Sequence, residues 1–481
     1  MEIQQKWQLT CHWLNKTMLF SGIPFLYYFL PIVLIVYFLV PKATKNTILL
    51  IASFVFYAWG EPAYVFLMAG SIFMGYVFGL LIEKYKTVAK IYMLVAISIS
   101  LGLLAYFKYT NFFIKNINAA TGLSIPLLNV ALPIGISFYT FQMISYIIDV
   151  YRGNVVAQKN PITLATYIAM FPQLIAGPIV RYSDVEKELQ NRTISFEKMA
   201  YGIRRFLLGL GKKIMIANVL GELVSIFKQS DEKTIVFYWG YAIAVSLQIY
   251  FDFSGYSDMA IGMGRILGFH FSENFNYPFL SKSVTEFWRR WHMSLGTWFR
   301  DYVYIPLGGS RCTKGRNIFN IFVVWCLTGF WHGAEWTFVV WGLYFAILLV
   351  VEKLFYYKWL NETRVIGHIY AICISIISFV IFDGTTLAES LQTIRCMVGF
   401  GNIPVMNSIT LYYLNSYAGI IAIAILGATP LPKYCIQYLK KYVIMQKIID
   451  TVEPVFMIVL LLVTTGYLVD GSFNPFLYFR F

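Results

Sequence analysis

Long apolar runs, each about the length of a membrane-spanning helix, recur from Met18 to the end of the chain. One of them reads FLYYFLPIVLIVYFLV, and a longer one reads IFNIFVVWCLTGFWHGAEWTFVVWGLYF. A helix needs about 20 mostly apolar residues to cross a bilayer, and by this measure roughly ten to twelve segments qualify as transmembrane or re-entrant helices. Only 13% of the 481 residues are charged, too few to cover the surface of a soluble protein of this length. We therefore expect an all-α, polytopic integral membrane protein.

The domain organisation, the net charge and the cysteines of the chain are consistent with an integral membrane protein. We expect residues 18–481 to form one membrane domain, whereas residues 1–17 lack the apolar pattern and form an N-terminal extension without an assigned function. The net charge of +14 is explained by Lys and Arg in cytoplasmic loops and against anionic lipid, so no nucleic-acid partner is expected. The six cysteines show no close pair and no metal-ligand spacing, so we expect no metal site.

His332 is an ionisable side chain inside the longest apolar run. Ionisable groups are costly at membrane depth, so such a residue indicates a functional site. Gly329 and Gly333 bracket it, which predicts that two helices meet at GFWHGAEW and that a substrate can approach closely. The rings of Trp331 and Trp336 are expected to exclude water, leaving a neutral imidazole able to act as a general base. The alternative is a structural histidine hydrogen-bonded to a carbonyl group.

The segment from Phe287 to Tyr302 reads as one amphipathic helix. One face would carry an aromatic stripe made of Trp288, Trp291, Leu295, Trp298 and Tyr302. The other face would carry Arg289, His292, Gly296 and Arg300. Both an interfacial membrane anchor and a site for an anionic ligand fit this pattern, because Trp and Arg serve as anchors and Arg also binds phosphate.

Two further segments place helix-breaking or acidic residues at or near membrane depth. In FPQLIAGPIVRY, Gly177 and Pro178 interrupt helical hydrogen bonding, which is tolerated there only inside protein or beside a wet cavity. We therefore expect this break to lie against the active site. Asp252 and Asp258 are interpreted mainly as structural partners of other groups rather than as catalytic residues.

The signature motifs of several enzyme classes are missing. The chain has no G-x-S-x-G, H-E-x-x-H or P-loop sequence. Metal-dependent hydrolysis and nucleotide hydrolysis therefore lose their support. A histidine reaction inside a membrane remains, and acyl transfer to a hydroxyl group fits it.

Several long segments resemble a known family. FWRRWHMSLGTWFRDYVYIPLGGSR and LTGFWHGAEWTFVVWGLY are similar to the two signature segments of the membrane-bound O-acyltransferases, in the bacterial branch that contains the alginate O-acetylation protein. The resemblance extends from Met18 to Phe481 through segments such as LPIGISFYTFQMISYIIDVYRG, YFDFSGYSDMAIGMGRILGF and ENFNYPFLSKSVTEFW. It implies spans around a central tunnel in a bacterial plasma membrane, an acyl thioester donor on the cytoplasmic side and an extracytoplasmic acceptor.

The resemblance also implies residue roles. His332 would be the central catalytic residue, and His292 would lie at the cytoplasmic side of the same tunnel. Residues expected to line the tunnel are Trp291, Trp331, Gly333, Gly177 and Pro178. We further expect the phosphates of acetyl-CoA, a substrate rather than a bound cofactor, to lie near Arg289, Arg290 and Arg300.

The predicted function is transfer of an acetyl group from cytoplasmic acetyl-CoA across the membrane, for O-acetylation of an exported or cell-surface polysaccharide. An extracytoplasmic acetyltransferase of the SGNH type, or a similar one, is the expected partner. One alternative is D-alanyl or other acyl transfer to teichoic acid or peptidoglycan, although DYVYIPLGG and the long C-terminal region are more similar to the polysaccharide branch. The other alternative is a non-catalytic transporter or export subunit.

Overall fold

The structure is a computed structural model that describes residues 18–175 and 177–470. The predicted extension, residues 1–17, lies outside the described residues. The chain divides into two compact units, and each is described by itself. The first comprises the described residues up to Gly202 together with Ala260–Phe271, and the second comprises Ile203–Met259 together with the described residues from Ser272 onward. That residues 18–481 form a single domain stays a prediction.

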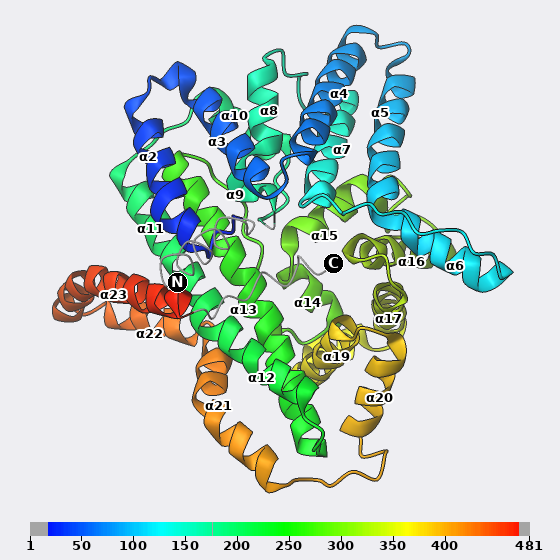
Figure 1. The fold of residues 1–481 in the computed structure, drawn as a ribbon, viewed down its shortest axis with the longest axis vertical. Coiled ribbons are helices and arrows are strands. Elements are labelled where there is room, and N and C mark those ends of the chain that lie inside the picture. Colours follow the sequence, from blue (N-terminus) through cyan, green and yellow to red (C-terminus); the bar gives the residue numbers. More distant parts are fainter. Residues whose placement is uncertain (1–17, 176, 471–481) are drawn as a thin grey trace, which may run out of the picture. The chain divides into compact units, whose positions relative to one another are not determined.

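The first unit is built from short and medium helices. They are η1 (Phe25–Phe29), α2 (Leu30–Leu39), η2 (Lys42–Thr44), α3 (Lys45–Gly60), α4 (Tyr64–Lys84), α5 (Ala89–Leu104), η3 (Ala105–Tyr109), α6 (Thr110–Thr121), α7 (Ile136–Arg152), α8 (Pro161–Ala169), α9 (Phe171–Leu174) and α10 (Tyr182–Gln190). Helices α4, α5 and α7 pack side by side (Figure 1). Helix α3 packs against α2 and α8.

The second unit holds the remaining helices, and α11 (Phe196–Gly211) and α13 (Ile235–Leu267) have residues in both units. Its other elements are η4 (Lys212–Ala217), α12 (Asn218–Gln229), η5 (Pro278–Leu280), α14 (Val284–Arg290), α15 (Met293–Phe299), η6 (Arg300–Tyr304), α16 (Lys314–His332), α17 (Trp336–Val351), η7 (Glu352–Tyr356), α18 (Tyr357–Glu362), α19 (Ile366–Asp383), α20 (Leu387–Met397), α21 (Ser408–Gly427), α22 (Leu431–Leu439) and α23 (Val443–Val469).

Seven helices within the described residues are long and apolar enough to cross a membrane. They are Tyr64–Lys84, Ala89–Thr121, Ile235–Leu267, Trp336–Glu362, Ile366–Asp383, Ser408–Gly427 and Val443–Val469. No β-strand occurs in the described residues, so the expected all-α, polytopic fold is confirmed. Other apolar runs form shorter helices: α3 has 16 residues, and the run that contains Pro172 is divided into α8 and α9.

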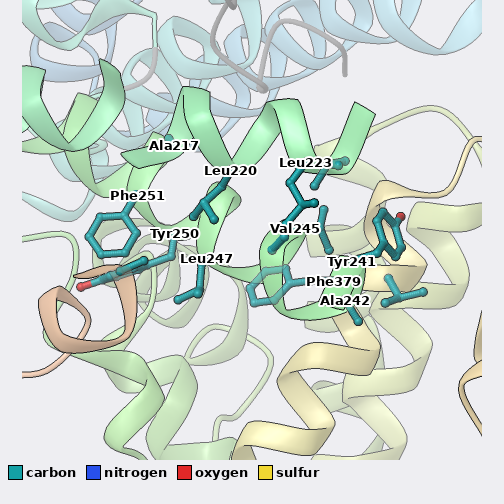
Figure 2. Packing of buried hydrophobic residues seen from close by; sticks show 14 of the residues in the cluster. Ala217, Leu220, Leu223, Tyr241, Ala242, Val245, Leu247, Tyr250, Phe251 and Phe379 are labelled. Carbon is teal, nitrogen blue, oxygen red and sulfur yellow. The ribbon is translucent and has the colours of Figure 1, made fainter. Parts of the chain in front are cut away.

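Helix α12 and the first half of α13 form the main packing layer of the second unit. Figure 2 shows their side chains facing one another, with Phe379 of α19 beside them. On α12, Leu220, Val224 and Phe227 recur at steps of three and four, so they fall on one face. Because lipid is as apolar as these side chains, close van der Waals contact rather than exclusion of water holds such helices together.

Helices α16 and α17 form a close antiparallel hairpin in which glycines replace side chains at the contact. A Cβ atom on Gly329 would lie 2.3 Å from the backbone oxygen of Phe338, and one on Gly342 would lie 2.4 Å from that of Trp325. Small residues allow helix backbones to approach closely in membranes. The two glycines therefore fix the geometry of the turn that ends α16.

Replacing Gly342 by alanine is expected to weaken this hairpin. The new methyl group would overlap the backbone of α16, and overpacking of this kind costs about 1–3 kcal/mol. Gly419→Ala, in α21, is the matched control, because a Cβ atom on Gly419 would meet no atom within 4 Å. In both variants alanine favours the helix over glycine by about 1 kcal/mol, so this contribution cancels in the comparison. Thermal unfolding in detergent should show a lower midpoint for Gly342→Ala alone. Equal midpoints for the two variants would contradict the role given to Gly342.

Candidate active site

His332 is the last residue of α16, at the turn between the hairpin helices. Gly333 follows it as the C-cap in an extended conformation, and α17 begins at Trp336. A Cβ on Gly333 would lie 2.2 Å from the ring of Phe338, so that ring packs directly on the turn. The prediction that two helices meet at GFWHGAEW is confirmed.

The His332 ring is buried among aromatic rings of the second unit. The centroids of Trp331 and Trp341 both lie 5.1 Å from its centroid, and that of Phe382 lies 5.3 Å away. Trp341 and Phe382 meet it nearly edge to face, at 82° and 85°. The enclosure of His332 is therefore apolar and densely packed. Sequence reasoning missed Trp341 and Phe382, although Trp341 follows Trp336 within the quoted apolar run.

Of the two tryptophans expected to exclude water, only Trp331 does so at the histidines. Trp331 is 2% exposed, and its ring lies 6.0 Å from that of His292 as well as against His332. The expectation for Trp336 is wrong: this side chain, the first residue of α17, is 55% exposed. The structure thus brings both predicted histidines to one tryptophan ring.

The segment around His292 is not the continuous helix that its spacing predicted. Helix α14 ends at Arg290 and α15 begins at Met293, and His292 between them has φ +43° and ψ +52°. This left-handed conformation is uncommon for a residue other than glycine. The expected stripe is therefore split, and Trp291 and Trp298 are buried in protein rather than facing lipid. Gly296 is exposed, and it contacts the histidine through its backbone N–H group, which donates to the His292 carbonyl at 3.1 Å.

A short backbone pairing holds this break in place. The Met293 N–H group donates to the Asn274 carbonyl at 3.0 Å, and the Asn276 N–H group donates to the Arg290 carbonyl at 2.9 Å. The segment that follows α13 is thereby tied to both sides of His292. This partner lies about 18 residues earlier in the chain, beyond the reach of a helical-spacing argument.

Asn274 fixes which nitrogen of His292 carries the proton. Its Oδ1 atom accepts from the Ser294 N–H group at 3.2 Å and from the Ser294 hydroxyl at 2.9 Å, while its Nδ2 group donates to Ser257 Oγ at 3.1 Å. Because a backbone N–H can only donate, the atom that it faces must be the amide oxygen. His292 Nδ1, 3.1 Å from the same oxygen, is therefore the protonated nitrogen.

The other nitrogen of His292, Nε2, carries a lone pair that is buried in the protein. Nε2 has no hydrogen-bond partner in the described residues, and His292 is 1% exposed. Burial lowers the pKa of His292, which lies outside the candidate spans, from 6.5 to about 3. The ring is thus neutral at physiological pH, with an unused acceptor in an apolar setting. Asn274 was not singled out from the sequence, although it belongs to the ENFNYPF segment that carried the family resemblance.

The three arginines predicted to bind the donor differ in whether a carboxylate pairs with them. Arg290 pairs with Glu286 at 2.8 Å, and Arg300 pairs with Asp301 at 2.7 Å. Arg289 is exposed and has no acidic partner within the described residues. Arg289 therefore keeps its full charge available to an anionic ligand.

Glu352 positions the helix that leads to His292. Its carboxylate accepts from the N–H groups of Val284 at 2.7 Å and Thr285 at 3.1 Å, the first residues of α14. The unpaired N–H groups and the dipole of a helix N-terminus favour a carboxylate there. Glu352 itself is fully buried. Nothing in the sequence spacing pairs it with α14, which precedes it by nearly 70 residues.

The two aspartates of α13 are structural partners, as expected. Asp252 forms a buried ion pair with Lys213. Asp258 pairs with Arg205 at 2.8 Å and with Lys212 at 2.7 Å.

Two predicted tunnel residues, Gly177 and Pro178, are buried in the first unit. Trp291, in the second unit, packs in the hydrophobic core against Phe275, Phe287 and Phe379. The tunnel-lining roles of all three stay predictions.

The fold and the site together define a polytopic membrane enzyme with two buried histidines in a water-excluding aromatic cluster. Residues 155–391 match the family described as MBOAT, membrane-bound O-acyltransferase. The probable alginate O-acetylase AlgI of Azotobacter vinelandii is 41% identical to this chain over 393 residues, 80% of this chain and 79% of the relative. The chain belongs to the membrane-bound O-acyltransferase family, and it is a multi-pass membrane O-acyltransferase that uses an acyl donor.

Two other relatives are named for different activities. The peptidoglycan O-acetyltransferase of Helicobacter pylori is 30% identical over 520 aligned residues, covering 96% of this chain and 98% of the relative. The teichoic acid D-alanyltransferase of Bacillus subtilis is 33% identical over 251 residues, covering 48% of this chain and 62% of the relative.

Proposed function

We propose that the protein is an O-acetyltransferase of a bacterial plasma membrane that moves acetyl groups from cytoplasmic acetyl-CoA to modify an exported or cell-surface polysaccharide. The observation that carries the proposal is the 41% identity to a probable alginate O-acetylase over 80% of the chain. The similarity to a teichoic acid D-alanyltransferase covers only 48% of the chain. Acetyl rather than D-alanyl transfer is therefore the better-supported activity.

The proposed chemistry uses His332 as the general base. Its imidazole takes the proton of the attacking hydroxyl, the oxygen bonds to the thioester carbonyl carbon, the carbon–sulfur bond breaks, and the leaving thiolate takes the proton. His292 offers a second neutral imidazole, whose Nε2 lone pair can accept a hydrogen bond from a hydroxyl or thiol. The aromatic rings around both histidines support the proposal, because excluding water protects a thioester from hydrolysis.

We assign the phosphates of the donor first to Arg289. Of the three arginines predicted to bind the donor, Arg289 is the one that has no acidic partner within the described residues. Arg290 and Arg300 would have to exchange their present carboxylates for phosphate. Arg289 can offer its guanidinium at no such cost.

The acceptor is proposed to lie outside the cytoplasm and to receive the acetyl group through an extracytoplasmic acetyltransferase of the SGNH type or a similar one. The names of the alginate and peptidoglycan acetylating relatives support a glycan as the final acceptor. Glycan acetylation should depend on both proteins in a reconstituted strain. Acetylation that persists without the secreted transferase would contradict the relay.

Release of CoA from labelled acetyl-CoA by the purified protein tests the proposed activity. We expect turnover above a lipid-only blank with acetyl-CoA, and little with a D-alanyl thioester of a phosphopantetheine carrier. Turnover of the D-alanyl donor alone would assign the protein to the D-alanyl class. Passage of substrate across vesicles without release of any thiol would indicate a transporter.

A further inference from the structure

Two cations lie over one tyrosine ring at the junction of α2 and α3. Lys45 Nζ is 4.4 Å and the Arg192 guanidinium carbon 5.6 Å from the centroid of the Tyr37 ring. Arg192 Nε donates to the Tyr37 hydroxyl, and Arg192 Nη1 donates to Asn46 Oδ1, both at 2.7 Å. The Tyr37 hydroxyl in turn donates to the Leu267 carbonyl at 2.6 Å. The guanidinium therefore has a fixed position.

No carboxylate neutralises these cations. Within residues 18–175 and 177–470, neither Lys45 nor Arg192 has an acidic partner, and the buried Arg192 Nη2 atom has no hydrogen-bond acceptor. Burial, and after it Arg192 and Lys42, lower the pKa of Lys45, as neighbouring like charges do. Lys45 is also the first residue of α3, where the helix dipole adds positive potential. Neighbouring cations without a counter-charge at a helix N-terminus favour an anion.

An apolar groove follows α2 and α3 away from these cations. It has a volume of about 760 Å³, and its lining includes Tyr28, Ile32, Val36, Ile48, Val55 and Trp59. Lys45 continues the row of Ile48 and Val55 at helical spacing, so the cations lie at one end of the groove. Helix α3 rises about 16 Å between Ile48 and Trp59, close to the roughly 15 Å of hydrocarbon in one leaflet.

We propose that the cations and the groove form a binding site for an anionic phospholipid, with its phosphate between Lys45, Arg192 and Lys42 and one acyl chain along the groove. A free phosphate would leave the groove unexplained, and a zwitterionic lipid would bring another cation to a cationic site. All the residues of this site belong to the first unit. The site is independent of the proposed acyl transfer.

Native mass spectrometry of the full-length protein in detergent tests the cationic end. The probes are dioleoylphosphatidylglycerol and dioleoylphosphatidylcholine. We expect the wild type to retain the anionic lipid more tightly, and Lys45→Gln to bind it about five-fold more weakly, the effect of one cation near an anionic lipid. Lys84→Gln is the matched control, since Lys84 also lies over a tyrosine ring, 5.2 Å from the Tyr85 centroid, at the end of α4.

Val55→Trp tests the groove separately. Val55 is 48% exposed, so a larger ring there would fill the groove without entering a packed core. We expect weaker retention of the anionic lipid and an unchanged unfolding midpoint in lipid-free detergent. Unaltered retention in Val55→Trp would overturn the proposal. So would equal binding of both lipids by the wild type, equal losses in Lys45→Gln and Lys84→Gln, or displacement of the lipid by millimolar inorganic phosphate, which would indicate a free-anion site.

Discussion

His332→Ala is expected to reduce release of CoA from acetyl-CoA by about 10²- to 10⁴-fold, the contribution of a general base. The substitution removes the only side chain assigned to take the hydroxyl proton. It also removes a ring that packs against Trp341 and Phe382, so lost activity alone does not separate chemistry from folding. The measurement is single-turnover release of labelled thiol by protein in lipid vesicles.

His332→Phe makes this prediction decisive. Phenylalanine keeps an aromatic ring between Trp341 and Phe382 but has no basic nitrogen, so the unfolding midpoint should stay near that of the wild type while activity is lost. His368→Ala is the matched control, because His368 is a partly buried histidine of the second unit whose Nδ1 lies 3.2 Å from the Ser281 carbonyl. Activity near the wild-type level in His332→Phe would exclude His332 as the base.

Asn274→Leu is expected to reduce activity by about 100-fold, because small misplacements of a reacting group have effects of this order. Leucine cannot accept the hydrogen bond from His292 Nδ1, so neither the orientation nor the protonated nitrogen of the ring is fixed. Asn276→Leu is the matched control. Asn276 is exposed, and it pairs with Arg290 only through its backbone N–H and carbonyl groups, which the substitution keeps.

Asn274→Asp separates positioning from packing. Aspartate can still accept from His292 Nδ1 and from Ser294, so the fold and part of the activity should be rescued relative to leucine. Its added charge favours the imidazolium form and raises the pKa of His292. In the wild type, this pKa near 3 leaves His292 neutral above pH 5. The aspartate variant should therefore lose activity as the pH falls through the raised pKa, and an unchanged pH profile would argue that Asn274 only fills space.

The charges around His292 support this reading of the pH profile. Burial is the cause that lowers its pKa. On the neighbouring elements, Asp258 of α13 and Glu273 pair with Arg205, and Arg290 of α14 pairs with Glu286. Arg289 of α14 has no acidic partner among the described residues, and its side chain is exposed to solvent rather than buried with His292. In the unfolded chain the His292 imidazole takes up a proton near pH 6.5, whereas in the folded protein it does so only near pH 3. The free energy of unfolding of the wild type should therefore fall by up to about 1.4 kcal/mol for each pH unit between these two values.

The class of fold and one half of the site follow from local sequence. Apolar length alone predicts the spans, because a bilayer admits few backbone solutions other than the helix. Gly329 and Gly333 predict the turn at His332, since glycine marks close approach within its own segment. The expectation of two tryptophans around His332 was half right. Which tryptophan of α17 faces the histidine depends on the rotation of that helix against α16.

The other half of the site depends on contacts between distant segments. The spacing from Trp288 to Tyr302 predicts one continuous helix, and nothing local signals the break at His292. Its left-handed backbone persists because Asn274 and Asn276 pair with the residues on both sides of it. A tertiary contact overrides helical propensity there. Such a contact can be recognised only from the three-dimensional structure, which shows that the segment of Asn274 and Asn276 lies beside His292.

Glu352 has a consequence for the order in which the protein is made. The first N–H groups of α14 receive their carboxylate from a residue synthesised nearly 70 positions later. While the ribosome is still adding α16 and α17, the start of α14 has no such acceptor, and the rings of Trp341 and Phe382 are also absent. The two histidines can therefore be enclosed only after α17 and α19 have been inserted. During biosynthesis the site closes late, from its C-terminal side.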